Sequence, residues 1–359
     1  MSDTTTTNPS PASPILPWKT KIALSLLSTV TDFARRNNGT VNRRLMGCFD
    51  VNAKVPSQPV PGLNISDITV DPSRNLWFRL YTPTDVTAKS PSGDTTTTAE
   101  GGASRQHLPV FIFFHGGGFA FLSAASVGYD VICRRFAREN SAIVVSVNYR
   151  LSPEFKYPCQ YEDGFDVLKF IDSKQCKDFP ANADLSRCFL GGDSAGANIA
   201  HHATVRATKN SNTFHELKII GLIQIQPFYG GEERTESEIR LKNAPLVSLP
   251  RTDWLWKVFL PDGCDRNHEA ANVFGSDKLV EEMKRNMDFP HTLVVIGGFD
   301  PLKDWARRYY EGLKKCGKDV DLIEYPNGVH AFYCFPELPE TDLLFKEVHD
   351  FIAKKCEAK

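Results

Sequence analysis

The sequence predicts an α/β fold with a mostly parallel central sheet and helices on both faces. The chain has 359 residues, of which 41% are hydrophobic, enough for one large core or two smaller ones. Short apolar runs lie at 109–114, 142–149, 188–190, 219–226, 292–296 and 320–325, and helix-length segments alternate with them at about 126–140, 160–173, 195–208, 301–316 and 340–355. Such alternation builds parallel sheets that are buried on both faces.

Charge and cysteine usage narrow the classes of partner. Lys and Arg (42) balance Asp and Glu (43), which gives no electrostatic reason to expect nucleic acid or an anionic membrane. No apolar run reaches membrane-spanning length and no basic leader precedes one, so a cytoplasmic location, with the nucleus as a second compartment, is expected. The nine cysteines are odd in number and lack C-x-x-C spacing, which argues against a disulfide framework and a zinc site. No metal and no cofactor are expected. A small organic ligand is the expected partner.

The N-terminal region predicts a tail followed by a helical lid. Residues 1–14 are rich in Thr, Ser, Asn and Pro and are expected to be disordered. Over Trp18–Ala34, apolar positions that include Leu26, Leu27 and Phe33 recur at helical spacing, which predicts an amphipathic helix. Packing on the domain surface is favoured over a membrane-surface helix. Residues 15–50 are therefore expected to form an N-terminal helical lid.

Three further segments complete the predicted organisation of the main domain, residues 60–357. The alternating runs Ile65–Val70 and Leu76–Tyr81, joined by turn residues, predict an antiparallel hairpin. Residues 84–107 are low in complexity and predict a flexible surface loop. The segment of about residues 228–290 does not continue the alternation of strands and helices. It is therefore expected to form a cap insertion over the ligand-binding edge of the sheet.

Residues 192–196, Gly-Asp-Ser-Ala-Gly, form a G-x-S-x-G frame after the apolar run 188–190. Between a strand and a helix, this frame is typical of a sharp turn that exposes a serine hydroxyl. A five-residue match also occurs by chance, so the frame alone leaves open whether Ser194 is a working nucleophile. The strand-like and helix-like segments on either side favour a nucleophile.

A second glycine-rich element, residues 115–118 (His-Gly-Gly-Gly), follows the predicted strand 109–114 directly. In lipases and esterases the N–H groups of such a loop polarise an ester carbonyl, and here the Ala195 N–H would join them in an oxyanion hole. The alternative is a glycine-rich turn or a phosphate loop. It is disfavoured because the G-x-G-x-x-G and G-K-[ST] patterns are absent.

An acid and a base are expected after Ser194 in the chain. Asp300 follows an apolar strand, at the end where ligands gather in open α/β sheets, although it could equally be only a helix N-cap. Asp304, inside the next helix, is the reserve candidate. His330 follows the last apolar strand. A lone histidine is more often structural, but the position downstream of Asp300 favours a catalytic base.

Four motifs occur in the order HGGGF (115–119), GDSAGAN (192–198), GFDPLKD (298–304) and GVHAFY (328–333). In this order they resemble the plant carboxylesterases of the hormone-sensitive lipase group, which have the α/β-hydrolase fold. The resemblance covers the chain from about residue 16 onward. It implies a serine carboxylesterase with an acyl-enzyme intermediate. By the family's motifs, the nucleophile is Ser194, its partners are His330 and Asp300, and the oxyanion donors are Gly117, Gly118 and Ala195, with Gly116 adjoining.

The same group contains the gibberellin receptor, whose lid is similar to residues 35–43 here and whose Tyr-Asp pair is similar to Tyr129-Asp130. The receptor has an aliphatic residue in place of the triad histidine and a serine in the glycine loop, whereas this sequence keeps His330 and Gly118. A non-catalytic hormone receptor is therefore the alternative function. In that case ligand would close the lid and create a surface for a protein partner, which the esterase interpretation does not require.

Two other comparisons within the group bear on function. The aromatic residue of the receptor lid corresponds to Thr31, which speaks against hormone binding. The isoflavonoid dehydratase carries threonine at the position of Ser194, which argues against a dehydratase. The N-terminal helix and the cap are expected to set the size of the pocket. This favours a short acyl chain on a bulky or aromatic alcohol, such as a secondary metabolite or hormone-like compound. The candidate pocket residues are Phe119, Tyr129, Tyr229 and Phe332, although they could equally be core.

Overall fold

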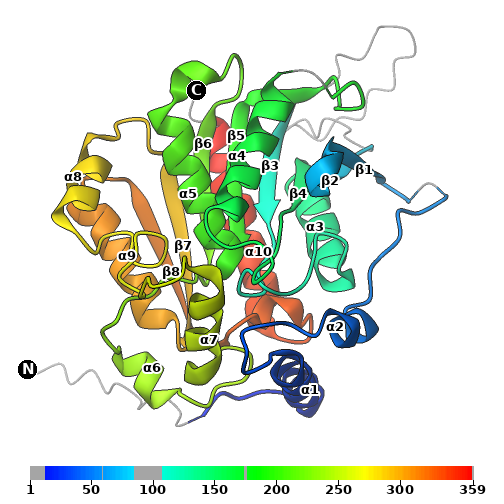
Figure 1. The fold of residues 1–359 in the computed structure, drawn as a ribbon. Coiled ribbons are helices and arrows are strands. Elements are labelled where there is room, and N and C mark those ends of the chain that lie inside the picture. Colours follow the sequence, from blue (N-terminus) through cyan, green and yellow to red (C-terminus); the bar gives the residue numbers. More distant parts are fainter. Residues whose placement is uncertain (1–12, 59, 85–106, 174–175, 358–359) are drawn as a thin grey trace, which may run out of the picture.

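The structure, a computed structural model, describes residues 13–58, 60–84, 107–173 and 176–357 (Figure 1). The expected tail and the expected flexible loop lie almost entirely outside the described residues. Within the described part the chain forms one central sheet, with helices on both of its faces. No helix in that part is long and apolar enough to span a membrane.

The sheet has eight strands in the order β1-β2-β4-β3-β5-β6-β7-β8. Pairing is antiparallel between β1 and β2 and between β2 and β4, and parallel from β4 to β8. The strands are β1 (Leu63–Asp71), β2 (Leu76–Pro83), β3 (Leu108–Phe114), β4 (Ile143–Asn148), β5 (Ala183–Asp193), β6 (Ile219–Ile225), β7 (His291–Phe299) and β8 (Val320–Val329). Every residue of β3 is buried, as expected for a strand covered on both faces. The predicted hairpin and mostly parallel sheet are confirmed.

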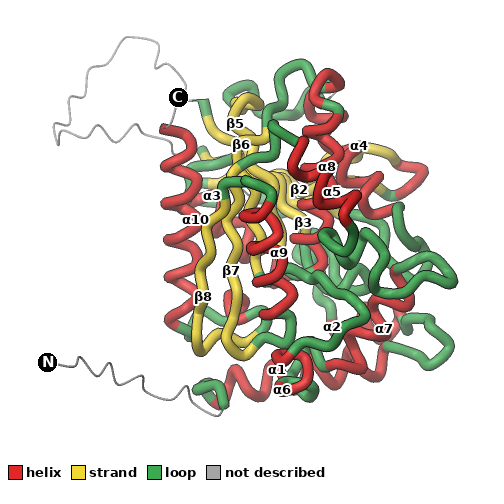
Figure 2. The backbone as a smooth tube through the Cα atoms, turned by 90° about the vertical axis from the view of Figure 1, so that its left-hand side faces the viewer, coloured by secondary structure: helices red, strands yellow, loops and turns green. Residues whose placement is uncertain are grey.

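Helices cover the two faces of the sheet, each over its own apolar cluster (Figure 2). One face carries α3 (Val127–Glu139) and α10 (Pro339–Glu357), and the other carries α4 (Cys159–Asp172), α5 (Ala195–Lys209) and α9 (Lys303–Lys315). All five agree with the segments predicted from the sequence. Because β5 lies in the middle of the sheet, the turn from β5 into α5 is central to the domain.

The N-terminal helices and two helices of the 228–290 segment lie together beyond one end of the sheet (Figure 1). They are α1 (Trp18–Ala34), α2 (Arg43–Phe49), α6 (Glu236–Arg240) and α7 (Leu249–Phe259), while α8 (Asp277–Arg285) lies beside α9. The helix predicted at Trp18–Ala34 is confirmed, and the predicted apolar positions Val30 and Ala34 are buried, but the rest of its packed face differs from the expected one. Leu24 is buried, whereas Leu26, Leu27 and Phe33 are exposed, because tertiary contacts with the β8–α10 region select the side that packs.

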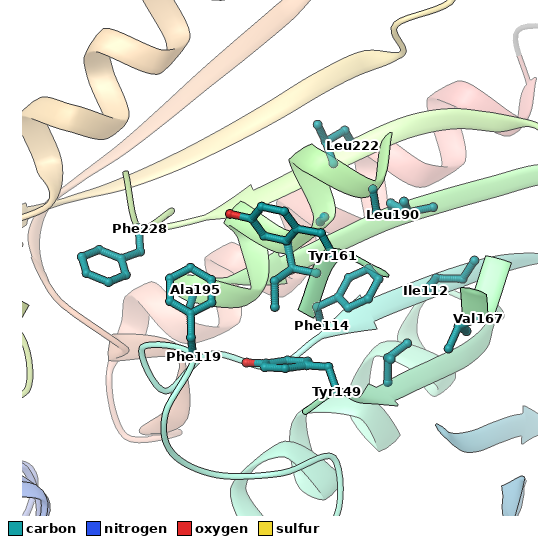
Figure 3. Close-up of a cluster of buried hydrophobic side chains, with 14 of the residues drawn as sticks. Ile112, Phe114, Phe119, Tyr149, Tyr161, Val167, Leu190, Ala195, Leu222 and Phe228 are labelled. Carbon is teal, nitrogen blue, oxygen red and sulfur yellow. The ribbon is translucent and has the colours of Figure 1, made fainter. Parts of the chain in front are cut away.

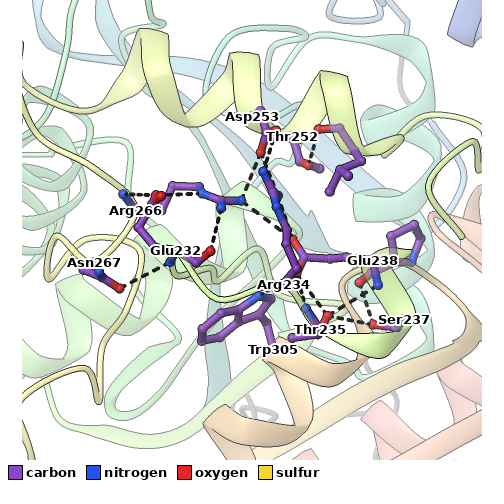
Figure 4. Close-up of polar contacts among 12 residues, drawn as sticks. Glu232, Arg234, Thr235, Ser237, Glu238, Thr252, Asp253, Arg266, Asn267 and Trp305 are labelled. Atoms are coloured by element: carbon purple, nitrogen blue, oxygen red, sulfur yellow. Dashed lines mark hydrogen bonds and ion pairs between the residues drawn. The ribbon is translucent and has the colours of Figure 1, made fainter. Parts of the chain in front are cut away.

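A polar network attaches the 228–290 segment to the main domain (Figure 4). The buried Glu238 carboxylate accepts hydrogen bonds from the Thr235 N–H at 2.9 Å and from the Trp305 Nε1–H of α9 at 3.1 Å. Arg234 makes a two-pronged ion pair with Asp253 of α7, at 2.9 and 2.7 Å. Two-pronged geometry of this kind is among the stronger charged contacts. The network therefore fixes α6 and α7 in position relative to the sheet.

Candidate active site

Ser194 lies at the sharp turn between β5 and α5, in the strained backbone conformation φ 52°, ψ −119°. The turn is held because the Ser194 N–H donates to the Ile225 carbonyl and the Phe228 N–H donates to the Ser194 carbonyl, both at 2.9 Å. Strain of this kind costs about 1–3 kcal/mol and persists only where the surroundings impose it. The predicted strand-turn-helix context of the G-x-S-x-G frame is therefore present, with the serine side chain at the carboxyl end of the central strand.

The two glycines of the frame are required by close backbone contacts. A Cβ on Gly196 would lie 2.0 Å from the Phe114 carbonyl oxygen, and one on Gly192 would lie 2.5 Å from both that oxygen and the Gly196 carbonyl carbon. No side chain fits at either position without moving backbone. The frame thus allows α5 to begin directly against the end of β3, which brings Ser194 close to the glycine loop.

Asp300 and His330 are brought together at the ends of β7 and β8, with 2.8 Å between the His330 Nδ1 and an Asp300 oxygen. Both side chains are buried, with 1% of Asp300 and 6% of His330 exposed. Burial disfavours the charged imidazolium, but the Asp300 and Asp193 carboxylates outweigh burial, so the pKa of His330 is raised above its ordinary value. The loop that carries His330 reaches the serine turn through Tyr333, whose hydroxyl donates to the carboxylate of Asp193, the residue before Ser194.

Asp300 has contacts on two sides, although the N-cap of α9 is Leu302 and not Asp300 itself. Its Oδ1 accepts the Leu302 N–H at 2.9 Å, close to the start of α9, while its Oδ2 faces His330. One carboxylate therefore anchors a helix start and contacts the histidine, because its two oxygens point in different directions. The reserve candidate Asp304 lies inside α9 and accepts the Ser237 N–H at 2.7 Å, which makes it part of the contact with α6.

The glycine loop turns sharply after β3, with positive φ at Gly117 (97°) and Gly118 (61°). A Cβ on Gly117 would lie 2.3 Å from the Phe121 carbonyl oxygen, and one on Gly118 would lie 2.4 Å from the Leu255 side chain of α7. Within the described part of the chain, no acceptor contacts the N–H groups of Gly117, Gly118 or Ala195. These three N–H groups are therefore the candidate donors to a ligand.

Gly116 differs from the other loop glycines because its N–H already has acceptors. It donates to an Asp193 oxygen at 2.9 Å and approaches the Tyr129 hydroxyl oxygen at 2.7 Å. An N–H engaged in this way cannot also stabilise an oxyanion. Gly116 therefore ties the loop to the serine turn, while Gly117, Gly118 and Ala195 remain the candidate donors and Gly116 adjoins them.

Asp193 forms a buried carboxylate centre beneath the serine turn, a feature that the sequence analysis missed. The hydroxyls of Tyr129 and Tyr333 donate to its Oδ2, at 2.9 and 2.5 Å. Burial raises the pKa of Asp193, although hydrogen bonds from both tyrosines and the nearby His330 oppose the increase. The signal in the sequence was the presence of Asp193, a charged residue, among the small residues of the G-x-S-x-G frame. The centre connects β5, α3, the glycine loop and the 328–333 motif.

Gln226 is a second residue that the sequence analysis missed. It is fully buried just after β6, and its side-chain amide contacts both the Asp300 carboxylate and the loop that carries His330. A polar residue at the end of an otherwise apolar strand, directly before a proline, was the signal in the sequence.

The four candidate substrate-binding residues are all buried and packed in the protein. Phe119 stacks on Phe259 of α7 with ring centroids 3.7 Å apart and lies near Phe228 and Ala195 (Figure 3). The Tyr229 hydroxyl donates to the Gln224 side chain at 2.8 Å. Tyr129 is bound to Asp193, and Phe332 is fully buried. Their packing supports the alternative that these residues are core, and it places Phe119 and Phe228 against the serine turn.

A cavity of about 720 Å³ opens elsewhere, between residues 38–40, α7 and the loop after it. Its lining includes Lys156, Asp253, Trp256 and Arg266 but none of Ser194, Asp300 and His330. Trp256 separates this cavity from the aromatic side chains near Ser194, because its ring stacks on Phe228 at 4.2 Å. The cavity is therefore distinct from the candidate active site.

The N-terminal helices are attached to the 228–290 segment and to the β4–α4 loop by charged contacts. Arg251 of α7 is 4% exposed and pairs with Asp32 of α1 at 2.5 Å. Arg43 of α2 pairs with Glu154 and donates to the Ser152 carbonyl. Because Arg251 is buried, its guanidinium depends on Asp32 for compensation of its charge. These contacts fix α1 beside α7, the helix that also contacts Gly118.

Replacing Asp32 by asparagine is expected to loosen α1, because the buried Arg251 guanidinium loses its charged partner. We expect hydrogen exchange in α1 to become at least about tenfold faster, with little change in the central strands. Asp262→Asn is the matched control, because Asp262 forms an ion pair with Lys156 while 96% exposed. Equal exchange of α1 in the two variants would contradict this account of the Arg251 contact.

Comparison with known proteins agrees with the fold and motifs. A family model of the alpha/beta hydrolase fold, Abhydrolase_3, matches residues 111–334, from the strand before the glycine loop to the residues after His330. The chain therefore belongs to the α/β-hydrolase fold family, and within it is close to gibberellin receptors and plant carboxylesterases.

The relatives include both receptors and esterases. Gibberellin receptor GID1C of Arabidopsis thaliana is 37% identical over 343 residues, covering 96% of each chain. Carboxylesterase 20 of Arabidopsis thaliana is 36% identical over 299 residues, covering 82% of this chain and 86% of its own. A hyperthermophilic esterase from the archaeon Pyrobaculum calidifontis superimposes with a TM-score of 0.73 over 96% of this chain and all of its own, at 23% identity, which supports the fold alone.

Proposed function

We propose that the protein is a carboxylesterase that hydrolyses short-chain acyl esters of small organic alcohols through Ser194, His330 and Asp300. The observation that carries this proposal is the buried pair of His330 Nδ1 and the Asp300 carboxylate, 2.8 Å apart. The pair orients the imidazole so that Nε2 is left to act on a proton. It occurs in a chain that also has a strained serine turn and free loop N–H groups.

In the proposed reaction, the Ser194 Oγ attacks the ester carbonyl carbon while His330 Nε2 accepts the hydroxyl proton. The carbonyl oxygen becomes an oxyanion, stabilised by the N–H groups of Gly117, Gly118 and Ala195. The bond to the alcohol oxygen then breaks, and His330 returns its proton to the leaving alcohol. Water attacks the acyl-enzyme by the same route, which releases the acid and restores Ser194.

We infer the size of the alcohol and acyl groups from the surroundings of the loop. Leu255 lies against Gly118, and Phe119 and Phe228 lie beside the serine turn, so bulk near the oxyanion donors is limited and the walls are apolar. This supports a short acyl chain and an apolar or aromatic alcohol, such as a secondary metabolite or hormone-like compound.

The proposal is tested by hydrolysis of p-nitrophenyl acetate and butyrate, with Ser194→Ala as the control. An organophosphonate label located by mass spectrometry identifies the nucleophile independently of turnover. We expect stoichiometric labelling of Ser194 and turnover that disappears in the variant. Absence of both turnover and label in the wild-type protein would rule out the esterase.

The pH dependence of the reaction follows from the raised pKa of His330. The base must be neutral, so kcat/KM is expected to rise with pH, with a midpoint above the ordinary histidine pKa of about 6.5. In Asp300→Asn the supporting carboxylate is lost. The midpoint should then move to lower pH, and the rate should fall because the imidazole loses its fixed orientation. An unchanged midpoint in this variant would contradict the assignment of Asp300.

A small-molecule receptor of the gibberellin type is the second candidate function. It is favoured by the 37% identity to a gibberellin receptor over 96% of the chain and by the attachment of α1 beside α7 near Gly118. A receptor would show ligand-induced protection of residues 18–45 from hydrogen exchange, with negligible turnover and no phosphonate labelling. The esterase experiment therefore separates the two functions.

A further inference from the structure

We infer that Gln226 is a positioning residue that holds Asp300 and His330, the acid and the base of the site, in a fixed arrangement. This inference rests on the proposed function. The Gln226 Nε2–H group donates to the Asp300 Oδ2 at 2.9 Å and to the Val329 carbonyl at 3.0 Å. The Gln226 Oε1 accepts the Ala331 N–H at 2.8 Å. One side chain thus bonds the Asp300 carboxylate and the residues on both sides of His330.

The direction of the Gln226 amide is determined by its partners. The Ala331 N–H can only donate, so the amide oxygen must face Ala331, and the NH₂ group must then face Asp300. The Asp300 Oδ2 therefore accepts one hydrogen bond from Gln226 and one from His330, while Oδ1 accepts the Leu302 N–H. With these donors around it, the carboxylate is held in a single orientation.

The backbone around Gln226 is built to bring the amide to this place. Gln226 has φ 44°, and its N–H donates to the Val295 carbonyl of β7 at 2.8 Å. Across the amide lies Gly297, where a Cβ would be 2.7 Å from the Gln226 Nε2 and 2.5 Å from the Gly328 carbonyl oxygen. A glycine at 297 thus leaves the space that the side chain of Gln226 occupies between β7 and β8.

A purely structural role would give a different result from positioning. If Gln226 only fills space, a side chain of the same shape without hydrogen bonds should reduce stability and leave the properties of His330 unchanged. If it positions the pair, the same change should alter His330 directly. The charged groups that act on His330 are Asp300 from the end of β7 and Asp193 from the end of β5, so both stay unchanged in the test.

The experiment compares Gln226→Met, which keeps the shape, with Gln226→Glu, which also keeps the acceptor for Ala331. Gln160→Met is the control, because Gln160 is also fully buried and hydrogen-bonded, to the Phe155 carbonyl, away from the site. For Gln226→Met we expect kcat for p-nitrophenyl acetate to fall on the order of 10²-fold with KM nearly unchanged, since binding groups are retained while the reacting groups are misplaced.

Gln226→Glu should show a pH signature that no structural defect produces. At low pH the new carboxyl is protonated and donates to Asp300 as the amide does. As pH rises it ionises, and two adjacent carboxylates repel each other. The kcat of Gln226→Glu is therefore expected to approach that of the wild type at acidic pH and to fall on the alkaline side, with a limb that the wild type and Gln226→Met lack.

A second measurement separates this inference from the proposed function. Nitrogen-15 NMR of the histidine side chains, with His330→Gln for assignment, follows the Nδ1 proton of His330 whether or not the protein turns over an ester. We expect that signal to shift or be lost in Gln226→Met and to be unchanged in Gln160→Met. An unchanged His330 signal in Gln226→Met overturns the inference. Absent turnover in the wild type, with the signal changed, would overturn only the esterase.

Discussion

Replacing His330 by alanine is expected to lower kcat for p-nitrophenyl esters by at least about 10⁴-fold while the fold is retained. His330 is the only group that the proposed mechanism uses to move protons between Ser194, the leaving alcohol and water. Without it, the serine hydroxyl attacks with its proton in place. The side chain is buried, but it lies on the loop after β8, so its truncation leaves the backbone hydrogen bonds of the strands and helices in place. Steady-state kinetics and circular dichroism would measure the two effects separately.

The double variant Ser194→Ala/His330→Ala provides the control for this prediction. Groups that act as a unit are not additive, so the double variant should be no less active than either single variant. A His330→Ala protein with near-native kcat would contradict the mechanism. If the losses in kcat of the two single variants multiplied in the double variant, Ser194 and His330 would act independently.

Replacing Gly196 by alanine is expected to be among the most damaging single-methyl changes in the chain. The new Cβ would lie 2.0 Å from the Phe114 carbonyl oxygen and 2.6 Å from that of His115, and both obstacles are backbone. The start of α5 must then move away from β3, which displaces the Ala195 N–H and the serine turn. We expect a loss of about 1–3 kcal/mol or more in the free energy of unfolding and at least about a 10²-fold loss in kcat.

Gly128→Ala is the matched control for Gly196→Ala. Gly128 lies in α3, where an added Cβ meets no atom within 4 Å, and alanine is a better helix former than glycine. The free energy of unfolding of Gly128→Ala, measured by denaturant titration, should stay within about 1 kcal/mol of the wild-type value. Its kcat should equal that of the wild type. If both alanine variants behaved alike, the close contact at the serine turn could not be the reason for the glycine.

The sequence was sufficient for the fold class and for placing the candidate site residues at the ends of strands. Apolar runs marked β3 to β8, and their ends placed Ser194, Asp300 and His330 after strands, because strand periodicity and turn composition are local properties. The same local signals identified α1. They selected only part of its packed face, because Leu24 and Leu26 are equally apolar and only contacts with distant segments distinguish them.

Which groups bond to which was decided only by the tertiary structure. The Gly116 N–H is engaged by Asp193, 77 residues away, whereas no such contact engages the neighbouring candidate donors Gly117 and Gly118 in the described part of the chain. Gln226 contacts Asp300 and Ala331, 74 and 105 residues away. Hydrogen bonds depend on atom positions within a few tenths of an ångström, and strand order in the sheet sets those positions. The sequence by itself therefore determined which chemical groups the protein places at the ends of its strands, and the packing of the sheet decided how those groups are paired.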